Sequence, residues 1–288
     1  MPELPEVETI SRQLDRIMRG RRILGITVRL QKMIRGNVRS FKRTVIGARV
    51  VKIRRRAKLI LFDLSNGWSF LVHLKMTGQL VFRQGRRLRF GGHPIRDGLR
   101  DLPNKYSHVI FKLDKGASLY FNDMRQFGFV KVMRTVDLEK YFLAEKYGPE
   151  PLRKDFTLTV FLGLLELKRV QRIKPLLMDQ SFIAGVGNIY ATEACFAARI
   201  KPDRRVCTIN LGTRKKLFQA IISILNNAVR LGGTTAKNYT DAHGQPGRYV
   251  PKLKVYGREG ELCYRCGHTI KADPLAGRGT AWCPGCQK

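Results

Sequence analysis

The chain has 288 residues and a formal net charge of +33, from 55 lysines and arginines against 22 acidic residues. A positive excess of this size most often meets phosphate backbones, either in an enzyme that acts on nucleic acid or in a structural protein of the ribosomal or chromatin type. No stretch approaches the roughly 20 apolar residues that span a bilayer, and the acidic N-terminus has no apolar signal region, so we expect a cytosolic protein without a membrane partner.

The first six residues carry the most specific chemistry in the chain. If Met1 is removed, Pro2 presents a secondary amine with Glu3 directly beside it. An α-amino group has a pKa of about 7.7 to 8.0, so part of it is neutral near pH 7 and can form an iminium with an electron-poor carbon. The alternative is an ordinary helix start, because Pro5 and Glu6 suit a first turn and apolar residues then recur at helical spacing up to residue 18. Both readings hold if a packed helix fixes the terminal proline.

Short runs of β-branched or alternating character dominate from there to about residue 134. We expect strands at residues 23–30, 49–54, 59–64, 69–74, 108–113 and 118–121. Turn residues separate these runs, which indicates antiparallel sheets in a sandwich or barrel. Residues 83–103 read as a loop rich in arginine and glycine, either a solvated face or a strip along a nucleic-acid backbone.

The pattern turns helical from about residue 137. We expect helices at residues 138–147, 158–168, 188–198 and 213–231. Gly185 and Gly187 come directly before the third of these, with Asn188 at its cap and Lys174 nearby. Free backbone N–H groups at a helix start bind phosphate, so this segment is either a phosphate contact or a plain helix start.

Four cysteines near the C-terminus have the sharpest spacing. The pairs Cys263-x2-Cys266 and Cys283-x2-Cys286, with sixteen residues between them, match a four-thiolate zinc site. Four thiolates leave no open coordination position, so we expect one structural Zn²⁺, with disulfides as the alternative. Arg278 stands between two glycines in the intervening segment, at the tip of an expected hairpin that either contacts phosphate or is a soluble turn.

Taken together, these motifs resemble a known family. The collinear matches are Pro2-Glu3-Leu4-Pro5-Glu6-Val7-Glu8-Thr9, Arg56-Ala57-Lys58, His73-Leu74-Lys75-Met76-Thr77-Gly78, Asn122-Asp123-Met124-Arg125-Gln126-Phe127-Gly128, Gly148-Pro149-Glu150-Pro151-Leu152, residues 185–190, Val255-Tyr256-Gly257-Arg258 and the four cysteines. Over essentially its whole length the chain resembles the bacterial formamidopyrimidine-DNA glycosylases. Endonuclease VIII, the sister family, shares the architecture but typically lacks the Leu-Pro-Glu-Val-Glu-Thr opening.

The resemblance implies an α+β multidomain fold with DNA bound in a cleft. We expect an N-terminal catalytic β-sandwich with the opening helix at residues 1–134, a linker at 135–150, a helix-two-turn-helix domain at 151–240 and a zinc-finger hairpin at 241–288. The expected partner is damaged double-stranded DNA. We expect a monomer in the cytoplasm, at the nucleoid, without a diffusible cofactor.

The implied activity is that of a bifunctional DNA glycosylase and AP lyase of base excision repair, which removes oxidised purines such as 8-oxoguanine and formamidopyrimidines. By resemblance, the Pro2 nitrogen displaces the damaged base and forms an iminium, while Glu3 moves protons and Glu6 is a supporting acid. Successive β- and δ-eliminations then cut the strand. Lys58 and Arg278 match the family residues that contact phosphate and assist these eliminations.

Other positions match residues through which the family binds DNA. Met76, Arg125 and Phe127 match side chains that fill the space left by the flipped nucleotide. The positions that match contacts to the DNA backbone are His73, Arg169, Lys174 and Asn188.

Three departures from the family pattern leave the lesion preference open. Gln126 stands where the family commonly has a second arginine, Tyr106 stands where it has a histidine, and residues 236–239 differ in the loop that covers the flipped base. Two rival functions stay open at this stage. One is an endonuclease VIII-like glycosylase for oxidised pyrimidines, and the other is a non-catalytic lesion-binding protein of the same fold.

Overall fold

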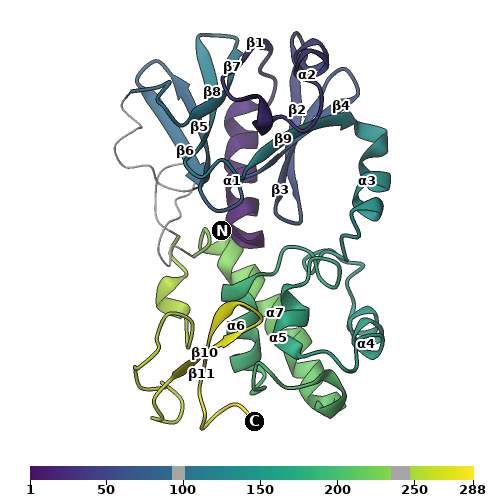
Figure 1. Ribbon diagram of the computed structural model, residues 1–288, viewed down its shortest axis with the longest axis vertical. Coiled ribbons are helices and arrows are strands. Elements are labelled where there is room, and N and C mark those ends of the chain that lie inside the picture. The colour runs from purple at the N-terminus through teal and green to yellow at the C-terminus, as the bar shows by residue number, and fades with distance from the viewer. Residues whose placement is uncertain (93–100, 235–246) are drawn as a thin grey trace. The chain divides into compact units, whose positions relative to one another are not determined.

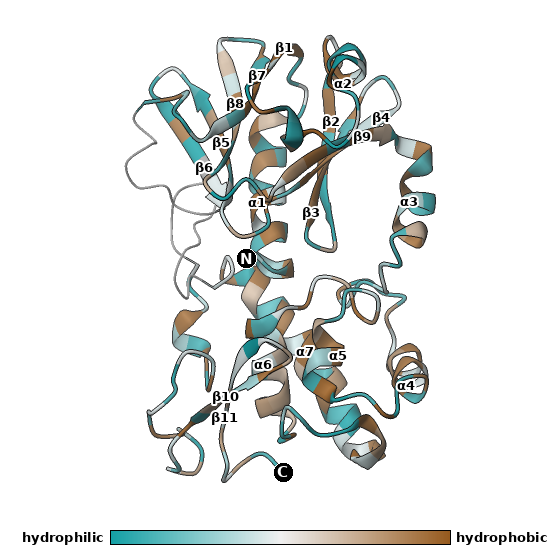
Figure 2. Ribbon diagram, viewed as in Figure 1, coloured by the Kyte–Doolittle hydropathy of each residue, from teal (hydrophilic) through white to brown (hydrophobic). Residues whose placement is uncertain are grey.

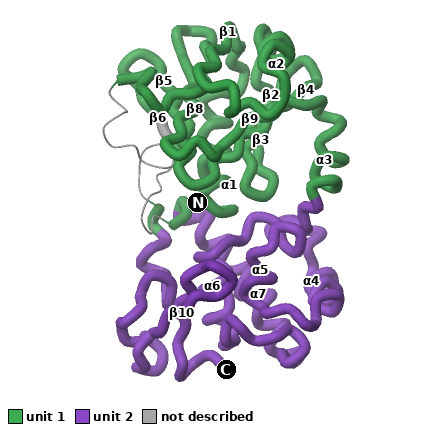
Figure 3. Tube along the Cα trace, in the orientation of Figure 1, with its two compact units in different colours: residues 1–145, 232–248 green, residues 146–231, 249–288 purple. Residues whose placement is uncertain are grey.

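The computed structural model describes residues 1–92, 101–234 and 247–288, and the chain forms two compact units (Figures 1 and 3). Unit 1 comprises Met1–Glu145 and Gly232–Arg248, and unit 2 comprises Lys146–Leu231 and Tyr249–Lys288. The α+β class predicted from the sequence is confirmed. Within the described part of the chain, no helix is both long and apolar enough to cross a membrane.

Unit 1 is built on two antiparallel sheets, as predicted. Their strand orders are β1-β7-β8-β5-β6 and β2-β3-β4-β9. The strands are β1 (Ile23–Val28), β2 (Val50–Arg56), β3 (Leu59–Leu64), β4 (Trp68–His73), β5 (Gly78–Gln84), β6 (Arg87–Gly92), β7 (Ser107–Leu113), β8 (Ala117–Asp123) and β9 (Phe129–Arg134). The prediction of a loop from residue 83 is wrong at its start, because β5 and β6 form a hairpin there; residues 93–100 of that segment lie outside the described residues.

The opening helix, α1 (Leu4–Met18), packs against strands of both sheets (Figure 1). Val7, Ile10 and Leu14, which recur at helical spacing, are at most 1% exposed and join the core of the sandwich. The helices that complete the described part of this unit are α2 (Val38–Val45) and α3 (Leu138–Ala144), with the short turns η1 (Gln31–Met33) and η2 (Thr135–Asp137). Because one face of α1 is buried in the core of the sandwich, the first residues of the chain are anchored to the two sheets.

Unit 2 is helical and carries a small hairpin. Its helices are α4 (Leu158–Glu166), α5 (Ile173–Met178), α6 (Asn188–Ala197) and α7 (Leu211–Arg230), followed by η4 (Val250–Lys252), with η3 (Val206–Thr208) between α6 and α7. The hairpin strands are β10 (Lys271–Leu275) and β11 (Arg278–Trp282). Brown and teal residues alternate along α7 in Figure 2, the pattern of a helix with one buried face.

The cysteine module shares a core with the helices of unit 2. Phe196 of α6 lies in one hydrophobic cluster with Val255, Ile270 and the cysteines Cys263 and Cys283. The side-chain amide of Gln287 also donates to the Ile200 carbonyl at 2.8 Å. The module is therefore attached to α6 by apolar packing as well as by the chain.

Candidate active site and metal centre

The sandwich fixes the chain's first residues at the start of α1. Pro2 is buried while Met1 is 45% exposed. Glu3 and Glu6 form a capping box in which the Glu3 backbone N–H donates to Glu6 Oε2 at 2.8 Å. Glu6 Oε1 accepts a second bond, 2.7 Å from the backbone nitrogen of Thr234. The structure thus brings the predicted Pro2, Glu3 and Glu6 together and ties them to a segment distant in sequence.

Lys58 lies in the two-residue turn that joins β2 to β3, the strands against which α1 packs. Its side chain is 6% exposed, and Ala57 beside it has a left-handed φ of +52°. Arg55 donates to the Ala57 carbonyl at 3.0 Å and to Glu8 of α1 at 2.8 Å. Arg55 therefore links the terminal helix to the Lys58 turn. Nothing in the local pattern of this arginine-rich strand singles out Arg55, so its role could not be predicted from the sequence.

Burial and arginines compete at Glu8. Burial raises the pKa of Glu8, but the Arg55 and Arg12 guanidinium groups outweigh this effect and hold the pKa below its usual value. The carboxylate bonds to both arginines, at 2.8 Å and 2.7 Å. This ionised carboxylate keeps Arg55 in place on the side of α1 that faces β2.

His73, the last residue of β4, is neutral in the folded protein. Burial, together with the neighbouring cations Lys75, Lys58 and Arg35, lowers its pKa to about 3. Its Nδ1 accepts the Lys75 backbone N–H at 3.0 Å, so the single ring proton belongs on Nε2. A neutral imidazole whose Nε2–H is surrounded by cationic side chains is suited to donate a hydrogen bond to a phosphate oxygen.

Three predicted DNA-contacting side chains lie on two neighbouring turns of unit 1. Met76 is 37% exposed and lies two residues before the start of β5, while Phe127 is 56% exposed on the loop between β8 and β9. The guanidinium of Arg125 lies 4.8 Å from the Phe127 ring centroid. Gln126 between them has a left-handed φ of +56°. Large apolar side chains of this exposure are available to enter a base stack.

Lys174 and Asn188 of unit 2 hold the hairpin. Lys174 is fully buried, and its ammonium donates to Asn188 Oδ1 and Thr280 Oγ1, both at 2.6 Å. The Asn188 side-chain amide donates to the Gly279 carbonyl at 3.1 Å. The prediction that Asn188 is the N-cap is wrong by one residue, because Gly187 takes that position and Asn188 is the first helical residue.

Arg278 is exposed and follows the hairpin turn directly. Both turn residues, Ala276 and Gly277, have positive φ, which is the type I′ turn that suits a tight hairpin. Arg169, also exposed, follows α4 and lies 3.6 Å from Glu166. Both predicted cations are therefore presented at the surface of unit 2.

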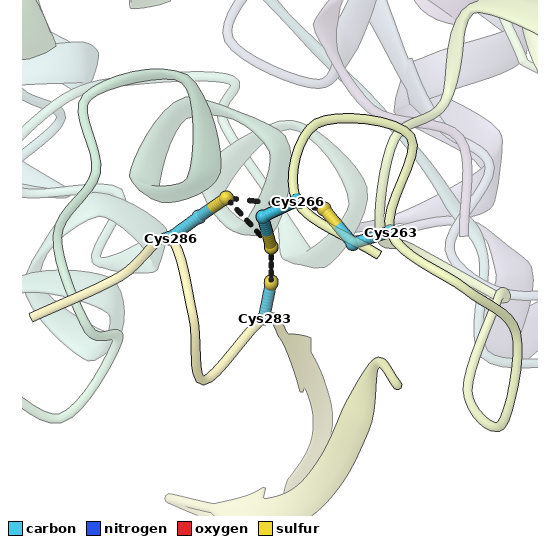
Figure 4. Close-up of side chains that lie close together, drawn as sticks. All are labelled: Cys263, Cys266, Cys283 and Cys286. Atoms are coloured by element: carbon cyan, nitrogen blue, oxygen red, sulfur yellow. Dashed lines mark hydrogen bonds between the residues drawn. The ribbon is translucent and has the colours of Figure 1, made fainter. Parts of the chain in front are cut away.

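The four predicted cysteines converge (Figure 4). Their sulfur atoms all lie within 4.8 Å of one another, and the shortest separations are 3.3 Å. A Zn–S bond of about 2.3 Å places tetrahedral sulfur atoms about 3.8 Å apart, so the cluster fits a four-thiolate metal ion. All six cysteines lie within the described residues, and each is a free thiol. The prediction that these four cysteines form a cluster able to hold a metal ion is confirmed.

Glu193 of α6 is a second residue whose role could not be predicted from the sequence. Its carboxylate accepts the backbone N–H groups of Lys254, Val255 and Tyr256 at 2.9 to 3.0 Å. Burial raises the pKa of Glu193, although these three bonds favour the charged form. The carboxylate thereby fixes the Val255-Tyr256 motif that leads into the cysteine module.

Family models match most of the chain. The formamidopyrimidine-DNA glycosylase N-terminal domain matches residues 1–130, the H2TH domain of the same enzymes matches 147–240, and a zinc finger found in FPG and IleRS matches 260–288. The chain belongs to the formamidopyrimidine-DNA glycosylase family. The resemblance inferred from the sequence is confirmed.

Relatives and solved structures of this family match the chain from end to end. The formamidopyrimidine-DNA glycosylase of Pelotomaculum thermopropionicum is 42% identical over 100% of this chain and 99% of its own length. That of Streptococcus mutans is 37% identical over the full length of both. A complex of Lactococcus lactis Fpg with DNA containing an abasic site matches with a TM-score of 0.88 and 33% identity, over 99% of each chain.

Proposed function

We propose that this protein is a bifunctional DNA glycosylase and AP lyase that excises oxidised purines from double-stranded DNA. The observation that carries this proposal is the burial of Pro2 and Glu3 at the start of α1, in a chain that matches the family over its full length. The structural neighbours support the substrate class, because the Lactococcus lactis protein was solved with DNA containing an abasic site and with DNA containing Fapy-dG.

The proposed nucleophile is the Pro2 nitrogen after removal of Met1. Its neutral form attacks C1′ of a nucleotide flipped out of the duplex, the bond to the damaged base breaks, and the base leaves with a proton. Glu3, 4% exposed beside it, is the proposed acid that protonates the sugar oxygen as the ring opens to the iminium. Glu6 is the supporting acid, because its two bonds fix the backbone on which Glu3 stands.

Elimination follows from the iminium, which acidifies the protons on the neighbouring sugar carbon. Loss of one such proton expels the 3′ phosphate, and a second elimination expels the 5′ phosphate. Lys58 is the proposed cation for the first of these phosphates, and Arg278 on the hairpin is the proposed cation for the second. Both steps are eliminations without net redox change, so the reaction needs no diffusible cofactor.

The remaining proposed roles concern DNA binding. Met76, Arg125 and Phe127 fill the space of the flipped nucleotide, with Arg125 donating to the acceptors of the orphaned base. The proposed contacts to the phosphate backbone are His73, Arg169, Lys174 and Asn188. Because Lys174 is buried, its charge acts on the phosphate through the Asn188 end of α6.

The metal is proposed to be one structural Zn²⁺ held by Cys263, Cys266, Cys283 and Cys286. Bound there, the ion supplies folding free energy to the hairpin that presents Arg278. We also propose the four-part division at residues 134, 150 and 240, a monomeric state, and action at the nucleoid in the cytoplasm, where the DNA substrate lies.

The proposal is tested by single-turnover excision from duplexes that carry either 8-oxoguanine opposite cytosine or thymine glycol. We expect excision of 8-oxoguanine, with both strand-cleavage products, and its loss in Pro2→Gly. Faster excision of thymine glycol would favour the endonuclease VIII-like function. Tight binding of the lesion without excision of the damaged base from either duplex would favour a non-catalytic protein.

A further inference from the structure

Asp123, at the end of β8, is a buried carboxylate for which the mechanism above has no use. It is 0% exposed, and its side-chain carboxylate bonds to the two turns that carry Met76 and Phe127. Its Oδ1 accepts the hydroxyl of Thr77, the residue after Met76. Its Oδ2 accepts the Gly128 backbone N–H at 2.7 Å, directly after Phe127.

The hydroxyl of Thr77 completes the connection. It accepts the Arg125 backbone N–H at 2.9 Å while it donates to Asp123, and the same Arg125 N–H lies 3.2 Å from Asp123 Oδ1. A charged acceptor with several donors is a strong and geometrically defined anchor. The two turns, 46 residues apart in sequence, therefore share one hydrogen-bonded centre.

The backbone of Asp123 is fixed as firmly as its side chain. Its N–H donates to the Tyr106 carbonyl at 3.0 Å, and its carbonyl lies 2.8 Å from His108 Nε2. Gly128 is required at this centre, because a Cβ there would lie 2.9 Å from the His73 carbonyl and 3.0 Å from Asp123 Oδ2. The anchor is thus bonded to the sandwich as well as to the two turns.

We propose that Asp123 and Thr77 are positioning residues that join the Met76 turn and the Arg125–Phe127 loop into one preorganised unit, whose side chains enter the duplex together. The inference rests on the proposed function and deepens it. Two separate turns would each lose conformational entropy when a side chain enters the base stack. A joined pair has already lost this entropy on folding, so insertion into the duplex costs less free energy. The carboxylate contacts no reacting atom in this account; it acts through the backbone of its neighbours.

The test uses insertion into DNA as a readout independent of catalysis. A duplex carries a tetrahydrofuran abasic site flanked by 2-aminopurine, whose fluorescence rises when the neighbouring stack opens. We expect Thr77→Val to reduce the equilibrium constant for insertion by about tenfold or more, because the substitution removes a hydroxyl that bonds to both Asp123 and the Arg125 N–H. Thr77→Ser keeps the hydroxyl and is expected to stay within about twofold of the parent protein.

Ser69→Ala is the matched control, because Ser69 also donates a hydroxyl to a carboxylate, Asp63 Oδ1, at 2.7 Å in the same unit. We expect it to leave insertion unchanged. Cleavage of a preformed abasic site in single-stranded DNA, which leaves no stack to fill, is expected to be unchanged in Thr77→Val, Thr77→Ser and Ser69→Ala. If Thr77→Val fails to fold, Asp123→Asn replaces it, since the amide has one acceptor oxygen and must place its NH2 against either the Gly128 N–H or the Arg125 N–H.

A double-mutant cycle distinguishes positioning from general stability. In the parent protein, Met76→Ala and Phe127→Ala are expected to be non-additive on insertion, and in the Thr77→Val background they should become additive. Additive effects in the parent, or an equal loss of single-strand cleavage in Thr77→Val, would overturn the inference. Normal insertion without excision by the parent protein would instead count against the proposed function and leave the positioning role standing.

Discussion

Glu6 and Thr234, which lie 228 residues apart in the sequence, are joined by a hydrogen bond. The Thr234 backbone N–H donates to Glu6 Oε1 at 2.7 Å, and the other oxygen of the same carboxylate accepts the Glu3 N–H at 2.8 Å. One side chain, 2% exposed, therefore fixes both the residue after the proposed nucleophile and the first residues of the segment after α7. Residues 236–239, the expected departure from the family pattern, begin two residues after Thr234 and lie outside the described residues.

Gly233→Ala is expected to disturb this bond. Gly233 and Gly232 both have positive φ, so alanine at either should cost about 1–2 kcal/mol of unfolding free energy. Only at Gly233 would the new Cβ meet Glu6, 2.8 Å from Oε1, whereas Gly232 has open space. We therefore expect Gly233→Ala to slow excision and Gly232→Ala to leave its rate unchanged in folded protein. Urea unfolding and single-turnover excision measure the two effects separately, and equal rates for both variants would contradict the account.

Removal of the metal should release the hairpin without unfolding the helices, because α4 and α7 pack together independently of the cysteines. We expect Cys263→Ser to lose zinc and to weaken DNA binding by about tenfold to a hundredfold, as one arginine contact is lost. Cys207→Ser is the control, since Cys207 is exposed and outside the cluster. Metal content and fluorescence anisotropy check the prediction. Full DNA affinity in metal-free protein would contradict it.

His73 should make the folded protein sensitive to acid. Its folded pKa of about 3 lies below the ordinary value of 6.5, so between these pH values the unfolded chain binds a proton that the folded chain does not. Stability is therefore intact above pH 6.5 and falls as the pH drops, by up to about 1.4 kcal/mol per pH unit from this group. Urea unfolding of the parent and of His73→Gln at several pH values should give a shallower acid loss in the variant. Parallel curves would show that His73 titrates normally.

Arg169 is expected to neutralise one phosphate. The logarithm of DNA affinity should fall linearly with the logarithm of salt concentration, and Arg169→Ala should reduce that slope by about 0.9. Lys140→Ala, at an exposed lysine of α3, is the control that removes the same charge outside the proposed contacts. Anisotropy titrations over a range of salt concentrations measure both slopes. An unchanged slope for Arg169→Ala would remove it from the interface.

Local patterns carried much of this fold and part of the site. The helical spacing of Val7, Ile10 and Leu14 predicted α1, and the cysteine spacing predicted the metal cluster, because both signals lie within short stretches of chain. Strand β6 lies in the segment predicted as a loop, because the arginine and glycine content of residues 83–103 outweighed the short polar–apolar alternation that starts at Arg87.

The contacts that position the site could not be read in the same way. The bond from Thr234 to Glu6 joins residues 228 apart, and that from Thr77 to Asp123 joins residues 46 apart. Such pairs are determined by sheet register and loop closure, and the local periodicity of the sequence does not encode either of them. Arg55 and Glu193 were missed for the same reason, because their partners come together only in the folded units.

The central claim is tested most directly by borohydride trapping on a duplex with one 8-oxoguanine opposite cytosine. With Met1 confirmed absent by mass spectrometry, reduction of the iminium should give a covalent protein–DNA adduct that maps to Pro2. Pro2→Gly should give no such adduct or a severely reduced yield. An adduct that maps to a lysine, or no adduct despite tight binding of the lesion, would contradict the assignment of Pro2 as the nucleophile.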